Sequence, residues 1–358
     1  MTGLFEQVGR RLLFGLDPET AHDLSIKALR CGLPLPKPPA DPRLAVRMGA
    51  LAFPNPLGMA AGYDKNGEIP DALLSLGFGF AEIGSITPRP QAGNPKPRIF
   101  RLTRDAAVIN RLGFNNEGHA RCAERLAARQ GRTGIVGVNI GANKDSTDRI
   151  ADYEAGVRLF APLATYLTVN ISSPNTPGLR NMQARGELAE LLGRVAAARQ
   201  ALSRDTPIFL KIAPDLTEAE LEDIAAELSA HPIEGLIVSN TTLSRYGLQD
   251  ATLTREAGGL SGKPLFARST IVLAKMRRLL GPKAAIIGVG GVDSAETALE
   301  KIRAGADLVQ LYTGLIYGGP ALPGRILRGM SAVLDREGIP SVAVLRDTRM
   351  EHWAGKAI

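Results

Sequence analysis

The chain has 358 residues, of which 44% are hydrophobic and 22% charged, so it is long enough to bury a large core. Its formal charge of +7 is spread along the sequence and only 5% of the residues are aromatic, which argues against a nucleic-acid-binding protein. An anionic substrate or an anionic membrane surface accounts for the positive charge at least as well.

The first part of the chain predicts two short amphipathic helices. Residues 4–16 place their apolar side chains on one helical stripe, and a second helix begins after the N-cap Asp17 and ends near Cys31. Prolines at 34, 36, 38, 39 and 42 then form a stiff linker. We therefore divide the chain into an extension, residues 1–38, and a main domain, residues 39–358. The helical pair either packs on the main domain or lies in a membrane interface and admits a lipophilic molecule.

Neither cysteine belongs to a metal or disulfide pattern, so Cys31 and Cys122 are expected to be reduced thiols of a cytoplasmic protein. Charged residues interrupt the N-terminal apolar stretch, so no signal peptide is predicted. No apolar run reaches the length of about 18 residues that crosses a bilayer.

Strand-like and helix-like segments alternate through the main domain. The candidate strands are Pro56–Ala60, Phe80–Gly84, Ile135–Ile140, Tyr166–Ile171, Ile208–Ile212, Gly235–Val238, Ala285–Val289 and Leu308–Tyr312. Helical patterns separate them, for example Leu188–Leu202, Glu218–Leu228 after a capping box at Thr217, Ser269–Leu280 and Ala295–Ala304. This alternation predicts a closed (β/α)8 TIM barrel, with an open doubly wound sheet as the alternative. The long connections 85–114 and 240–267 are expected to form lids or binding walls.

Small, amide-bearing, hydroxylic or cationic residues follow the strands, where a barrel holds its active site. The stretch from Asn170 through Ser173, Asn175 and Thr176 is the richest of them. Turn chemistry alone explains any single case, but not the whole series. Since these positions carry no His, Cys or carboxylate cluster, no metal site is predicted.

Two features suggest the ligands. Gly288–Gly291 and Thr313-Gly314 provide backbone N–H groups after the last two strands, the usual phosphate cradle of a barrel, although the pattern is not GxGxxG. Lys65 and Lys211 are expected to meet at the barrel mouth. They either pair with an anionic substrate and a cofactor that becomes negative on reduction, or one of them forms a Schiff base.

Several ordered motifs resemble those of the dihydroorotate dehydrogenase family, the flavin barrel of pyrimidine synthesis: Ala61–Lys65, Gly84–Gln91, Val108–Asn115, Asn170–Arg180, Lys211–Asp215, Asn240–Arg245, Gly258–Pro264 and Ile287–Val292. Ser173 resembles the base of the membrane-associated, quinone-reducing class (class 2), because the soluble class has cysteine there. The helical extension is also characteristic of that class.

The resemblance implies that dihydroorotate is oxidised to orotate, with FMN as the bound hydride acceptor and ubiquinone as the final one. Ser173 would remove the proton, and Thr176 with a water molecule would carry it away. The substrate residues would be Lys65, Asn110, Arg111, Leu112, Gly113, Phe114, Asn170, Asn175, Asn240 and Thr241. The FMN residues would be Ala61, Gly62, Tyr63, Asp64, Lys65, Ser85, Asn139, Asn170, Lys211, Ser239, Gly262, Gly291, Tyr312 and Thr313.

By the same resemblance, quinone would enter between the two N-terminal helices along His22 and Arg101. The protein would then lie peripherally on the cytoplasmic side of the cell membrane. A soluble form that uses fumarate, a flavin-free Schiff-base aldolase and a non-catalytic phosphate-ligand-binding barrel are the alternatives.

Overall fold

The computed structural model describes residues 9, 12–32, 40–202, 204–231, 233–250 and 252–358. Most of the first predicted helix, residues 4–16, and the linker at 33–39 lie outside the described residues, so the division at residue 38 stays a prediction. The second predicted helix is α2 (Pro18–Arg30), and Asp17 caps it by accepting hydrogen bonds from the N–H groups of Glu19 and Thr20.

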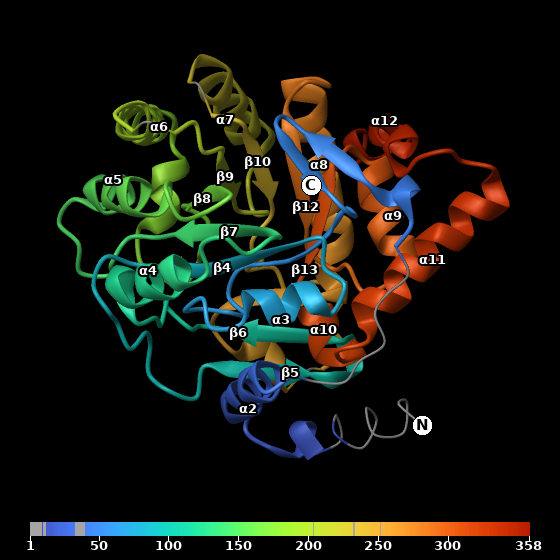
Figure 1. Cartoon of the computed structure of the whole chain (residues 1–358), viewed down its shortest axis with the longest axis horizontal. Helices are drawn as coiled ribbons and strands as arrows, with labels where there is room; N and C mark the ends of the chain where they lie inside the picture. Colours follow the sequence, from blue (N-terminus) through green and yellow to red (C-terminus); the bar gives the residue numbers. More distant parts are fainter. Residues whose placement is uncertain (1–8, 10–11, 33–39, 203, 232, 251) are drawn as a thin grey trace.

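Eight parallel strands close into a barrel, which confirms the predicted (β/α)8 fold and excludes the open sheet (Figure 1). In spatial order the strands are β10 (Gly235–Val238), β12 (Ala285–Val289), β13 (Leu308–Leu311), β3 (Leu57–Met59), β4 (Phe80–Ile86), β7 (Ile135–Ile140), β8 (Tyr166–Asn170) and β9 (Ile208–Ile212). Every predicted strand is present, and its ends shift by at most two residues.

Helices cover the outside of the barrel. They are α3 (Pro70–Ser75), α4 (Gly118–Ala128), α5 (Arg149–Phe160), α6 (Arg185–Gln200), α7 (Glu218–Ala230), α8 (Phe266–Leu280), α9 (Ala295–Arg303) and α11 (Leu322–Glu337). The capping box at Thr217 is present, because its hydroxyl accepts from the N–H of Glu220 while the Glu220 carboxylate accepts from the N–H of Thr217. Short helices α10 (Thr313–Gly318) and α12 (Met350–Ala354) complete the C-terminal part.

Aromatic rings fill the barrel at the amino ends of its strands. Phe80, Tyr166 and Phe209 pack edge to face, with ring centroids 6.3 and 5.5 Å apart. Glycines on neighbouring strands make the room, since a Cβ at Gly58 or Gly137 would lie 2.3 or 2.1 Å from one of these rings. This packing closes one end of the barrel and leaves the carboxyl ends of the strands for a ligand.

The two long connections build a second layer that was not predicted from the sequence. They supply β5 (Ile99–Leu102), β6 (Ala107–Asn110) and β11 (Gly259–Gly262), which form an antiparallel sheet in the order β11-β6-β5. Helix α2 packs beside β5 (Figure 1). A small hairpin, β1 (Val46–Met48) with β2 (Leu51–Phe53), was also not foreseen. The two long connections therefore form a sheet, and α2 from the N-terminal extension packs beside it.

Candidate active site

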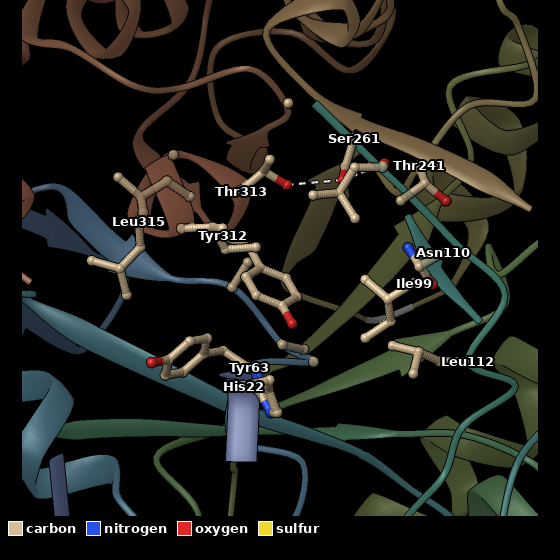
Figure 2. Close-up of a pocket in the computed structure, with 18 of the residues that line it drawn as sticks. His22, Tyr63, Ile99, Asn110, Leu112, Thr241, Ser261, Tyr312, Thr313 and Leu315 are labelled. Atoms are coloured by element: carbon tan, nitrogen blue, oxygen red, sulfur yellow. Dashed lines mark hydrogen bonds between the residues drawn. The ribbon is translucent and has the colours of Figure 1, made fainter. Parts of the chain in front are cut away.

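A cavity of about 730 Å³ lies at the carboxyl ends of the barrel strands. Figure 2 shows residues of α2, of β6 and of the segment after β13 around this one space. Most of the predicted site residues line it: His22, Ala61, Gly62, Tyr63, Lys65, Ser85, Arg101, Asn110, Leu112, Gly113, Phe114, Asn170, Ser173, Asn175, Lys211, Ser239, Asn240, Thr241, Gly262, Gly291, Tyr312 and Thr313. Residues near opposite ends of the sequence, from α2 and from the segment after β13, thus share one pocket.

Four predicted site residues do not line this cavity. The Asp64 carboxylate accepts hydrogen bonds from backbone N–H groups of its own loop, those of Asn66, Glu68 and Ile69. Arg111 pairs with Glu256 and lies over the ring of Phe100.

Asn139 is fully buried against Ser85 and Asn170, which line the cavity, and Thr176 is buried in the loop that carries Ser173. We infer that Asp64 and Asn139 shape the pocket from behind. For Arg111 and Thr176 the structure shows no side-chain contact with the cavity.

Amide side chains surround the part of the cavity next to Ser173. Asn175 donates hydrogen bonds to the backbone oxygen and to Oδ1 of Asn110, at 3.1 and 3.2 Å. Two buried oxygens at the cavity wall, Thr241 Oγ1 and Asn115 Oδ1, have no hydrogen-bond partner among the described residues. Thr241 Oγ1 faces Gly259, where a Cβ would lie 1.9 Å from it, so this oxygen does not point into the cavity.

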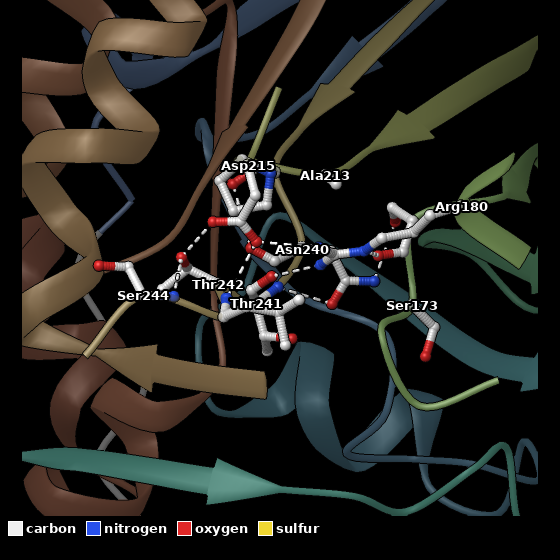
Figure 3. Close-up of polar contacts among 12 residues, drawn as sticks. Ser173, Arg180, Ala213, Asp215, Asn240, Thr241, Thr242 and Ser244 are labelled. Atoms are coloured by element: carbon white, nitrogen blue, oxygen red, sulfur yellow. Dashed lines mark hydrogen bonds and ion pairs between the residues drawn. The ribbon is translucent and has the colours of Figure 1, made fainter. Parts of the chain in front are cut away.

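Ser173 is buried and its hydroxyl oxygen accepts a hydrogen bond of 3.2 Å from the N–H of Asn175. The loop around it is held by Arg180, which donates to the backbone oxygens of Ser172 and Thr241 and pairs with Asp215 at 2.9 Å (Figure 3). Arg180 therefore ties the Ser173 loop to the loop after β10. Sequence reasoning gave Arg180 and Asp215 no role, although both lie within the family motifs.

A chain of buried polar groups lies below the cavity. Glu82 is fully buried and accepts hydrogen bonds from Asn139, Tyr166 and Gln310. Asn139 in turn accepts from Ser85 and from Asn170, which both line the cavity. Because each of these amides has its orientation fixed from below, the groups that face the cavity are held in place. No sequence motif marked Glu82 as a site residue, because the burial of an acid within a strand is known only once the barrel has folded.

The two lysines do converge on the cavity. Burial lowers the pKa of Lys65 to about 8, and the carboxylates of Asp23 and Glu19 oppose that shift. Burial also lowers the pKa of Lys211, against the charge of Glu82. Within the described chain neither lysine has a carboxylate in contact, so both ammonium groups remain available to an anionic ligand.

The glycine turn after β12 is built as an anion cradle. Gly290 and Gly291 have positive φ angles of 112° and 74°. A Cβ at Gly291 would lie 2.5 Å from Phe266, so only glycine fits. The N–H groups of Gly291 and Val292 make no hydrogen bond within the described chain, and both residues line the cavity. Free N–H groups on a turn at a cavity wall fit a phosphate group.

Helix α2 closes the apolar end of the cavity. Nε2 of His22 lies 3.0 Å from the ammonium nitrogen of Lys65, and the Ser25 and Tyr63 hydroxyl oxygens are 2.8 Å apart. Burial and the charge of Lys65 hold the pKa of His22 well below its usual range, so the neutral ring accepts the hydrogen bond. Arg101 donates to the backbone oxygens of Leu13 and Leu16. The predicted quinone residues thus lie between this helix and the barrel.

Two negative findings hold for the described part of the chain. No group of three or more His, Cys, Asp or Glu side chains is arranged to hold a metal ion there. None of the helices in this part of the chain has the length and apolarity needed to span a membrane.

Comparison with known proteins gives a consistent result. The family model for dihydroorotate dehydrogenase matches residues 43–334. Proteins named dihydroorotate dehydrogenase (quinone) from Mesorhizobium japonicum and Brucella ovis are 70% and 64% identical to this chain over 356 and 362 residues, which is 99% and 100% of each chain. The crystal structure of DHODH from Eimeria tenella in complex with ferulenol is 39% identical, with a TM-score of 0.88 over 94% of this chain and 98% of its own. The match of the family model and these full-length similarities show that the chain belongs to the dihydroorotate dehydrogenase family.

Proposed function

We infer that this chain is a quinone-dependent dihydroorotate dehydrogenase, which oxidises (S)-dihydroorotate to orotate in pyrimidine biosynthesis. The observation that carries this assignment is a single cavity that joins Ser173, Lys65 and Lys211 to residues of α2. The relatives that bear this name cover the whole chain, and the cavity holds groups suited to each step.

FMN is the proposed bound cofactor, and the residues fit it. The free N–H groups at Gly291 and Val292 suit its phosphate, with Gly262 and Thr313 beside them. Lys211 would place positive charge beside the ring system, which Ala61, Gly62, Ser85, Asn170, Ser239 and Tyr312 border. When bound, FMN takes a hydride from the substrate and gives electrons to the quinone.

The amides and Lys65 would hold the substrate. Lys65 suits the carboxylate, while Asn110, Asn175 and Asn240 offer neutral donors and acceptors to a flat polar ring. Thr241, which also lines the cavity, would contact the same ligand. Leu112, Gly113 and Phe114 would cover the ring, and Asn115 joins this set as a residue that sequence reasoning missed.

Ser173 would remove the proton from the substrate carbon next to the carbonyl, and that proton would pass to its oxygen. The N–H of Asn175 points at this oxygen and stabilises the negative charge that develops as the hydroxyl loses its own proton. Thr176, buried three residues further along the same loop, remains our candidate for passing the proton on through a water molecule.

Ubiquinone is the proposed final acceptor, and it would reach the cavity past α2. Apolar side chains line that end, among them Leu13, Phe14, Ala21 and Leu315, and His22 and Arg101 supply polar contacts. Leu12, Leu16 and Leu24 expose 69%, 39% and 42% of their surface close by. Such a surface suits peripheral attachment to the cell membrane, on the cytoplasmic side.

Anaerobic spectroscopy tests the assignment. Purified protein should show flavin absorbance, dihydroorotate should bleach it, and a ubiquinone analogue should restore it. Absence of flavin, or a flavin that dihydroorotate leaves oxidised, contradicts the proposal. Recovery with fumarate but not with quinone favours the soluble type of reaction. Trapping of substrate on Lys65 or Lys211 by borohydride favours the Schiff-base alternative.

A further inference from the structure

Lys301 is a buried cation that the mechanism above does not use. It belongs to α9 and none of its surface is exposed. Its ammonium group donates to Ser269 Oγ at 2.9 Å and to Thr270 Oγ1 at 3.0 Å, and it lies 5.1 Å from the ring centroid of Phe266. The absence of a side chain at Gly288 leaves space for its stem, since a Cβ there would lie 3.2 Å from Lys301 Cδ.

This lysine differs from its buried neighbours on α8. Lys275 pairs with Glu218 at 2.6 Å and Arg277 with Asp307 at 2.7 Å. No carboxylate pairs with Lys301 in the described part of the chain, and burial lowers its pKa to about 7. A buried charge without a counter-ion is strongly disfavoured, which raises the question of which anion balances it.

The contacts of Lys301 lead to the cavity wall. Since Ser269 accepts a hydrogen bond from Lys301, its own proton is available to the backbone oxygens of Leu265, Phe266 and Gly290, at 2.8, 3.1 and 3.2 Å. Leu265 and Gly290 line the cavity. The trans peptide after Gly290 places the N–H of Gly291 on the side opposite to the Gly290 oxygen. Because the Gly290 oxygen faces Ser269 on α8, the unpaired N–H of Gly291 points away from α8.

We propose that Lys301 is a positioning residue for the phosphate group of FMN: through Ser269 it holds the Gly290–Gly291 turn and keeps a positive charge behind the anion cradle. The inference rests on the proposed function, because it takes FMN as the ligand of the cavity. It assigns a phosphate-specific role to a residue that touches neither the substrate nor the flavin ring. The phosphate would be the missing counter-ion of Lys301.

Riboflavin, which is FMN without the phosphate, separates this role from a purely structural one. The full-length protein, freed of flavin, is titrated with FMN and with riboflavin by fluorescence quenching. Lys301→Met should raise the Kd for FMN roughly tenfold, because it removes a charge that acts across one layer of side chains. The Kd for riboflavin should stay within about twofold of the wild-type value. Lys275→Met, which removes a buried lysine that has its own carboxylate, should leave the ratio of the two Kd values unchanged.

The proposal is wrong if Lys301→Met changes both Kd values by the same factor, or neither. If that variant does not fold, as judged by circular dichroism, Ser269→Ala decides: it should weaken FMN binding roughly threefold and spare riboflavin. An unchanged FMN-to-riboflavin ratio in Ser269→Ala then overturns the role of Lys301. Wild-type protein that binds no FMN at all overturns the proposed function as well, so the two failures are distinguishable.

Discussion

At the scale of single residues, the buried hydroxyl of Ser173 carries the proposed proton removal. Ser173→Ala should slow reduction of the flavin by dihydroorotate by roughly 100- to 10,000-fold, the usual contribution of a positioned base, while the Kd of orotate changes little. Stopped-flow absorbance under anaerobic conditions measures the rate. Ser229→Ala is the control, because the Ser229 hydroxyl donates to the backbone oxygen of Ala225 on α7, away from the cavity. Equal effects of the two variants would remove Ser173 as the base.

Protonation of Lys65 should make the Kd of orotate depend on pH. Its ammonium form pairs with a carboxylate, and burial places its pKa at about 8. Lys65 is fully protonated well below that pH and loses its charge as the pH rises through it. The Kd of orotate should therefore increase on the alkaline side, by up to about tenfold per pH unit. Binding measured by flavin absorbance from about pH 6 to 9 tests this expectation.

Lys65→Met provides the control for that titration. It should bind orotate weakly at every pH and lack the alkaline increase in Kd. A pH-independent Kd in the wild type would mean that Lys65 does not hold the carboxylate.

At the scale of structural elements, Arg180 joins two loops of the site. Arg180→Met removes hydrogen bonds to Ser172 and Thr241 and the ion pair with Asp215. The free energy of unfolding should fall by about 1–3 kcal/mol, since the Asp215 carboxylate loses its closer ion-pair partner and keeps Arg268 at 3.4 Å. Misplaced loops should also lower kcat/KM for dihydroorotate by roughly 10- to 100-fold.

Urea unfolding and steady-state kinetics measure these two effects. Arg185→Met is the control, because the Arg185 side chain is 63% exposed in its pair with Glu227. If the Arg180→Met protein is destabilised but has a normal kcat/KM, the contacts of Arg180 contribute to folding and not to catalysis.

A buried ion pair attaches helix α2 to the segment just before β5. Glu19 pairs with Arg98, whose side chain is 6% exposed. Although burial alone would raise the pKa of Glu19, the hydrogen bond and charge of Arg98 outweigh it and lower that pKa. Glu19→Gln should therefore loosen α2 and raise the KM for a long-chain quinone by about tenfold, without slowing flavin reduction by dihydroorotate.

Separate assays of the two half-reactions check this expectation. Arg30→Ala is the matched control, since Arg30 pairs with Glu68 across 3.7 Å with 70% of its side chain exposed, and such pairs contribute little. If Glu19→Gln impairs both half-reactions equally, α2 is not a quinone-specific element.

At the scale of the whole molecule, the charge of +7 and the exposed leucines near α2 predict reversible binding to anionic lipid vesicles. Binding should weaken as the salt concentration rises, because the electrostatic part is screened. Leu24→Glu should reduce co-sedimentation with vesicles, whereas Leu243→Glu, at an exposed leucine of the loop after β10, should not. Equal loss in both variants would argue against attachment through α2.

By itself, the sequence determined the strands, most of the helices and the site motifs. Some structural signals involve only a few neighbouring residues and can therefore be recognised in the sequence. Examples are apolar runs, capping residues such as Thr217 and glycine turns such as Gly290-Gly291. Most of the predicted site residues accordingly line one cavity. The closed barrel followed from counting strands, although only the pairing of the last barrel strand, β13, with the first, β3, showed closure.

The tertiary structure alone decided the contacts between distant residues. The sheet β11-β6-β5 forms from two loops whose strands are short and carry no clear alternation. The approach of His22 to Lys65, the burial of Glu82 and the unpaired charge of Lys301 depend on how helices dock on the barrel. Their energies come from burial and from partners brought together by folding, and neither quantity exists along the chain before it folds.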